Sequence, residues 1–169
     1  MRKFKGMAML ALGAVVVLAG CGDRRMGVFG AKQQECMARA MYFESNRSSR
    51  DGMIAVGSVV MNRVASDAFP DDVCSVVGQR GQFAPGVMTK PMSEDASRAR
   101  VMEAASAVLA GERHPGIENA QFFHMASYHA GYNNMHYVLT TGGNAFYEKR
   151  RPEAVTQPTP VAATEGVTG

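Results

Sequence analysis

One carboxylate in this chain has the setting that acid–base chemistry needs. Glu44 ends the apolar segment 36–44 (CMARAMYFE), and helical spacing places it on the same face as Met37, Ala40 and Met41. Burial on an apolar face raises a carboxyl pKa, because the charged form loses its hydration. A glutamic acid of this kind donates a proton near neutral pH, as cleavage of glycosidic bonds requires. The alternative is that the helix ends here and Glu44 points into solvent.

The beginning of the chain has the composition of a secretion signal. Three basic residues precede an apolar run over 7–18, which is shorter than a transmembrane helix needs to be. The run ends in residues 18–21 (LAGC), which is typical of a bacterial lipobox, where the cysteine is lipidated and becomes the mature N-terminus. We therefore expect 1–20 to be a lipoprotein signal peptide and Cys21 to carry the lipid anchor. An ordinary cleaved signal with a chance cysteine is the alternative.

Two further features bear on location and partners. Gly22 follows the cysteine, where an aspartate would retain a lipoprotein at the inner membrane, so we expect the outer membrane, facing the periplasm. Loss of the signal removes three of the 18 basic residues and leaves 15 acidic residues in place, so the formal charge falls from +3 to zero. No basic stripe remains to indicate nucleic acid, and we expect a monomer.

Two cysteines remain after lipidation, Cys36 and Cys74. In an oxidising periplasm an even pair is interpreted first as a disulfide, with two buried thiols as the alternative. A bond closing a loop of this length would stabilise the fold by a few kcal/mol through its effect on the unfolded state.

The elements that must position Glu44 follow from periodicity and capping. The mature chain of roughly 150 residues is enough for one domain, which we expect over 33–150 after a tether at 21–32. A Gly- and Pro-rich loop is expected at 78–92, and a disordered tail without apolar period at 151–169. We expect helices at 33–45, 50–65, 73–77 and 96–110, and strands at 120–125 and 144–149. Ser48 or Ser49 would cap the second of these helices, and Ser93 would cap the last.

Three stretches together resemble a known family. Residues 38–44 (ARAMYFE), followed by 51–64, are similar to the opening of the SleB/CwlJ-type cell wall hydrolase family. Residues 69–77 (FPDDVCSVV) and the pair Gln82-Phe83 resemble its middle, and 116–124 with 143–147 resemble its end. The resemblance spans about 34–150, nearly the whole mature domain.

The resemblance implies both a fold and an activity. It implies an α+β, mainly α domain of the lysozyme/lytic-transglycosylase-like type with a small antiparallel sheet, acting on peptidoglycan glycan strands. Glu44 matches the family's catalytic acid, and no obvious second carboxylate accompanies it, since Asp51 is expected in the first turn of a helix. A lone acid suits a lytic transglycosylase acting between N-acetylmuramic acid and N-acetylglucosamine, with one group as acid and then base. No cofactor or metal is implied.

Further residues are candidates for substrate contact, each with a structural alternative. Gln82 could bind an acetamido group, and Phe83 could face a sugar ring or pack onto the core. His124 could bind sugar or position Glu44. Asn62 is expected to bind a loop rather than substrate, and Tyr147 to pack in the core rather than bind substrate.

The chain departs from the family's pattern at three positions. Ser48 stands where the family often has a second glutamate, and Asn144 stands where it has a histidine. Gly81 replaces a family cysteine; if that cysteine normally pairs with the one at Cys74, Cys36 is the available partner.

Two other functions are alternatives to this one. A non-catalytic peptidoglycan-binding lipoprotein on the same scaffold is the main alternative, because the departures at Ser48 and Asn144 could make the site inert. A zinc amidase would need histidine ligands, but the spacing of His124, His129 and His136 lacks the tight pair on one helix that zinc sites use.

Overall fold

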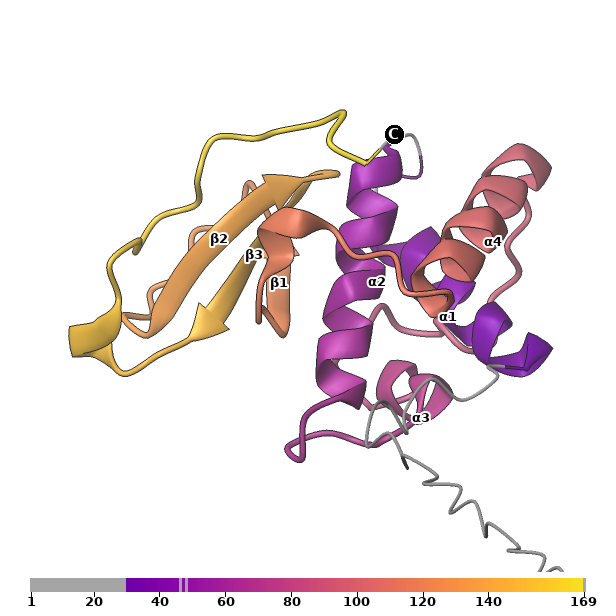
Figure 1. The fold of residues 1–169 in the computed structure, drawn as a ribbon, viewed down its shortest axis with the longest axis horizontal. Coiled ribbons are helices and arrows are strands. Elements are labelled where there is room, and N and C mark those ends of the chain that lie inside the picture. The colour runs from indigo at the N-terminus through magenta and orange to yellow at the C-terminus, as the bar shows by residue number, and fades with distance from the viewer. Residues whose placement is uncertain (1–29, 46, 48, 169) are drawn as a thin grey trace, which may run out of the picture.

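Helix α2 (Arg50–Val64) stands in the middle of the molecule, with a small sheet on one side and helices α1 (Ala31–Glu44) and α4 (Asp95–Leu109) on the other (Figure 1). The short α3 (Val73–Val77) lies beside the C-terminal end of α2. This computed structural model describes residues 30–45, 47 and 49–168. The expected signal peptide, Cys21 and Ser48 lie outside the described residues. Within them, no helix has the length and apolar character needed to cross a membrane.

The helices begin and end within two residues of where the sequence predicts them. The Ser49 hydroxyl caps α2 by accepting a hydrogen bond from the Gly52 N–H, and Asp72 caps α3 in the same way. The predicted Ser93 cap of α4 is wrong. Glu94 occupies that position without a side-chain cap, since its carboxylate binds Arg47 and the Ser97 hydroxyl instead.

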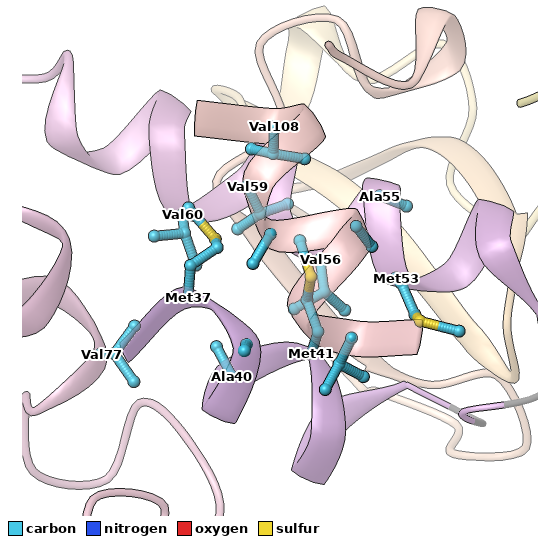
Figure 2. Packing of buried hydrophobic residues seen from close by; sticks show 14 of the residues in the cluster. Met37, Ala40, Met41, Met53, Ala55, Val56, Val59, Val60, Val77 and Val108 are labelled. Atoms are coloured by element: carbon cyan, nitrogen blue, oxygen red, sulfur yellow. The ribbon is translucent and has the colours of Figure 1, made fainter. Parts of the chain in front are cut away.

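The core lies between α1, α2 and α4. Met37 and Met41 of α1 are completely buried and pack against apolar side chains of α2 and against Val108 of α4 (Figure 2). Gly57 permits this approach, because a Cβ there would stand 2.4 Å from the Met41 methyl group. The face of α1 that carries Glu44 is therefore the face that packs into the core.

A disulfide joins Cys36 of α1 to Cys74 of α3. The Val73 N–H also donates to the side chain of Gln33, 3.0 Å away. Both contacts attach α3 to the helix that ends in Glu44.

The sheet has three antiparallel strands in the order β1-β3-β2. The predicted strands are present as β1 (Phe122–Met125) and β3 (Asn144–Lys149), whereas β2 (Met135–Thr141) has no counterpart among the predicted elements. A two-residue turn, Gly142-Gly143, joins β2 to β3 with φ values of +57° and +80°, which favour glycine. Gly142 also contacts Gly52 of α2. A Cβ added at Gly52 would lie 2.6 Å from the Gly142 Cα, so the contact requires glycine there.

The prediction of a disordered tail at 151–169 is wrong for the described part of that segment. After the short 3₁₀ helix η2 (Pro152–Ala154), the chain runs beside β2 and returns to the beginning of α2 (Figure 1). The Tyr137 N–H donates to the Gln157 carbonyl, and the Thr164 N–H donates to the Thr140 carbonyl, both at 2.9 Å. Backbone bonds to the outer edge of β2 thus replace the apolar packing that this segment lacks.

The end of the tail is held by Asp51. The Asp51 carboxylate, only 2% exposed, accepts from the N–H groups of Val167 and Thr168 at 2.8 and 2.6 Å. Burial raises the pKa of Asp51, but a bond from the Thr168 hydroxyl together with these two N–H bonds outweighs it and holds the pKa below its usual range. The folded domain therefore extends from Ala31 to Thr168, beyond both limits predicted from the sequence, 33 and 150.

Candidate active site

Glu44 is the last residue of α1 and is partly buried, as its place on the apolar face predicts. Its Oε1 accepts a hydrogen bond from the Ala84 N–H. Burial raises the pKa of the Glu44 carboxyl, while the Ala84 N–H and the positive charge of Arg63 offset part of this rise. Glu44 therefore keeps its proton at a higher pH than an exposed glutamate does.

The Gly- and Pro-rich loop supplies the other side of the site. A pocket of about 510 Å³ is lined by residues 78–81 and 83–89 of this loop. Glu44 is not part of this lining, but the Ala84 N–H joins the two by binding its carboxylate. Arg39 of α1 holds this loop by donating from Nε to the Val87 carbonyl at 2.6 Å and from a second nitrogen to the Lys90 carbonyl. The helix that carries Glu44 thus also fixes the loop that contacts it.

Phe83 and Gln82 are neighbours in this loop with different surroundings. Phe83 is 8% exposed, and its ring centroid lies 6.3 Å from that of Phe123. Of its two predicted roles, Phe83 therefore has core packing. Gln82 is exposed and is free to meet a ligand at the surface. Of the two, Gln82 stays a candidate for substrate contact.

Asn144 fixes the main chain at Glu44. Its side chain is buried, and its Nδ2 donates to the Glu44 carbonyl across 2.7 Å. Since Met125 pairs with Asn144 in the sheet, this bond also brings the ends of β1 and β3 to the end of α1. The amide thus supports the position of Glu44 without any acid–base role of its own.

His124 and Tyr147 lie together on the sheet. His124 Nε2 is 2.7 Å from the Tyr137 hydroxyl, and Nδ1 is 2.9 Å from the Met125 carbonyl. Tyr147 stacks on Phe122 at 5.6 Å, and its ring centroid is 5.7 Å from that of His124. Neither ring nitrogen of His124 is bonded to Glu44, so the expected positioning of Glu44 by direct contact is not found. Both side chains are partly exposed.

Asn62 binds a loop, as expected. Its Nδ2 donates to the carbonyls of Glu118 and Ala120 at 3.0 and 2.9 Å, and so fixes the segment that leads into β1. Two histidines of the zinc alternative have other partners: His124 bonds to the Tyr137 hydroxyl, and His136 Nδ1 accepts from the Thr156 and Gln157 N–H groups. In the described part of the chain, no three His, Cys, Asp or Glu side chains gather in a way that could hold a metal.

Arg63 was not predicted at the site. Its side chain is buried, and its guanidinium lies 5.2 Å from the Phe83 ring centroid. A charged residue inside the apolar run of α2, beside Asn62, is the signal that could have identified it. The Ala84 N–H could not have been found, because a backbone donor has no sequence signature.

The family comparison gives one match. A family model described as Cell Wall Hydrolase matches residues 47–147. The matched range begins just after Glu44, so the assignment of Glu44 depends on its surroundings rather than on this match. No curated protein matches the sequence.

Two solved structures resemble the fold. The catalytic domain of the germination-specific lytic transglycosylase SleB from Bacillus anthracis is 23% identical, with a TM-score of 0.56, over 72% of this chain and 98% of that chain. The catalytic domain of the Bacillus cereus SleB protein is 22% identical, with a TM-score of 0.58, over 76% and 100% of the two chains. These likenesses confirm the fold expected from the sequence, a mainly helical α+β domain with a small antiparallel sheet.

Proposed function

Because this chain belongs to the cell wall hydrolase family, we propose that it cleaves the glycan strands of peptidoglycan as a lytic transglycosylase, with Glu44 as acid and then base. The observation that supports this most is the half-buried Glu44 carboxyl with a raised pKa beside the loop pocket. Such a group holds a proton to donate and can take one back within one turnover.

The absence of a free partner carboxylate nearby in the sequence favours this mechanism over hydrolysis. Hydrolytic glycosidases generally use a second carboxylate at a defined distance, either as a nucleophile or to activate water. Asp51 is the next carboxylate that the structure describes after Glu44, and its oxygens bind the Val167 and Thr168 backbone. It is therefore not free to serve as that second group.

The chemical steps balance with Glu44 alone. The Glu44 carboxyl protonates the oxygen between N-acetylmuramic acid and N-acetylglucosamine, and the bond from that oxygen to the muramoyl C1 breaks. The muramoyl 6-hydroxyl oxygen then bonds to C1, and its proton returns to the Glu44 carboxylate. The ring product is a 1,6-anhydro sugar, no water is consumed, and Glu44 ends the cycle protonated.

The products of digestion test this proposal. We expect the chain without residues 1–20 to release soluble muropeptides from purified peptidoglycan that are lighter by one water at muramic acid. Mass spectrometry distinguishes them from the full-mass reducing ends that a hydrolase makes. Reducing ends would contradict the transglycosylase mechanism, and no release over several pH values would favour the non-catalytic binding lipoprotein.

We also propose that the enzyme is a lipid-anchored monomer at the outer membrane, facing the periplasm. The support is the sequence LAGC over 18–21, followed by Gly22. In bacteria fed labelled palmitate, we expect the wild type to carry the label in the outer-membrane fraction and Cys21→Ala to lose it. Label retained by Cys21→Ala would contradict anchoring at this residue, and label in the inner-membrane fraction would contradict the placement.

A further inference from the structure

The guanidinium of Arg63 is buried with little hydrogen bonding. The residue is 3% exposed, and its Nε donates to the Gln121 carbonyl at 2.8 Å. Its Nη1 is buried and finds no acceptor among the residues that the structure describes. Burial of a charge is costly unless other groups compensate it, so the surroundings of Arg63 need an explanation.

Aromatic rings surround this charge. The Arg63 guanidinium carbon lies 5.2 Å from the ring centroids of Phe69 and Phe83 and 5.8 Å from that of Phe122. These rings come from the turn after α2, the pocket loop and β1. Cation–π attraction to the three rings holds the charge at a fixed place where these segments meet. We call Phe69, Phe83 and Phe122 the aromatic cage.

Arg63 stays charged in this cage at neutral pH. Burial lowers its pKa to about 10, and the nearby Tyr147 and Glu44 oppose the change. Besides Glu44, the titratable groups described beside the cage include two of β3. Tyr147 stacks on Phe122, and Lys149 lies over the same ring at 4.3 Å.

The cage is connected directly to Glu44. Phe83 contacts Arg63, and the next residue, Ala84, donates its N–H to the Glu44 carboxylate. Among the described residues, Arg63 makes no ion pair with any carboxylate. Its positive charge lowers the pKa of the Glu44 carboxyl from a distance, without a salt bridge. At low local dielectric such an interaction favours the ionised form of the carboxyl.

We propose that Arg63 is a positioning residue for the proposed reaction: from its aromatic cage it stabilises the Glu44 carboxylate that remains after proton donation. This rests on Glu44 being the acid of the proposed function. The same charge makes Glu44 a better donor in the first step, because the product of donation is the carboxylate. Burial thus favours the protonated form of Glu44 before the reaction, and the Arg63 charge favours the carboxylate that forms when the proton is donated.

The test compares variants with and without the charge. Arg63→Met is neutral and apolar, Arg63→Gln is neutral but keeps an N–H donor for the Gln121 carbonyl, and Arg63→Lys keeps the charge. We expect the neutral variants to lower the rate of peptidoglycan cleavage roughly tenfold or more at neutral pH. The pH at which activity falls on the alkaline side should also be higher in the neutral variants than in the wild type. Arg63→Lys should return this pH to the wild-type value.

A measurement on the free protein separates this proposal from the proposed function. The Glu44 carboxyl, labelled with carbon-13 and followed by NMR in the absence of substrate, should titrate at higher pH in the folded neutral variants. An unchanged midpoint would overturn the proposal, even if the wild type makes anhydro products. If both neutral variants unfold, Phe122→Leu, which admits water to the cage and screens the charge, must raise the midpoint; no change there would overturn it equally.

Discussion

Replacement of Glu44 by glutamine is expected to lower peptidoglycan cleavage by roughly 10²–10⁴-fold, the usual contribution of a positioned general acid. The amide has the size of the carboxyl and can still accept the Ala84 N–H, but it has no acidic proton to give to the glycosidic oxygen. Release of soluble muropeptides measures the rate, and circular dichroism checks that the fold is kept.

Glu35→Gln is the matched control, because Glu35 lies on the same helix and the chemical change is the same. The Glu35 carboxylate is partly exposed and makes only a long contact of 3.4 Å to Arg39, which keeps its bonds to the Val87 and Lys90 carbonyls without it. Its replacement should leave cleavage near the wild-type rate. A folded Glu44→Gln protein that cleaves as fast as Glu35→Gln would remove Glu44 from the mechanism.

The pH dependence has a definite sign. The acid works only while protonated, so activity is present below the pKa of Glu44 and is lost as the pH rises through it. Since burial raises this pKa above its ordinary value, the alkaline loss falls at a higher pH than for an exposed glutamate. The rate–pH profile of the wild type measures this directly.

Loss of the Cys36–Cys74 disulfide is expected to cost about 3–4 kcal/mol in the free energy of unfolding. The bond joins cysteines separated by 38 residues, and a loop of that length gains much conformational freedom in the unfolded chain when it opens. Urea unfolding of the double variant Cys36→Ala/Cys74→Ala measures the difference.

The wild type treated with a reducing agent is the control for this experiment, since it loses the bond without the change of side chains. Both proteins should unfold at similar, lower urea concentrations than the oxidised wild type. A loss below about 1 kcal/mol would mean that the bond hardly constrains the unfolded chain. Because the bond ties α3 to the helix of Glu44, the reduced enzyme should also lose activity at a lower temperature.

The helices could be predicted because local patterns determine them. In α2, Ser49 caps the start, and Met53, Val56 and Val60 recur at helical spacing, so both period and boundary are visible in the sequence. β2 was missed, although the glycine pair at 142–143 is a hairpin signal that could have indicated a strand before it. The ordered tail could not be predicted, because it is held by hydrogen bonds to the β2 backbone and to the distant Asp51, which leave no side-chain period in the segment itself.

The candidate site, like the fold, could be predicted only where a local sequence pattern determines it. Helical spacing places Glu44 on the apolar face of α1, and the resemblance of residues 38–44 to the family's opening favours it as the acid over the solvent-exposed alternative. The contacts that tune it come from segments far away in the chain: Arg63 from α2, Ala84 from the loop and Asn144 from β3. Sequence spacing does not report such distant pairs, so the role of Asn144 in fixing the Glu44 main chain became visible only in the fold.

The segment beside β2 has a consequence for how the molecules behave toward one another. β2 is one of the two edge strands of the sheet, and an open strand edge is a template for pairing with another chain. Gln157 and Thr164 occupy hydrogen-bonding positions on that edge, which a neighbouring molecule would otherwise fill. A chain cut after Arg150 would leave these positions on β2 open, and we expect it to self-associate and precipitate.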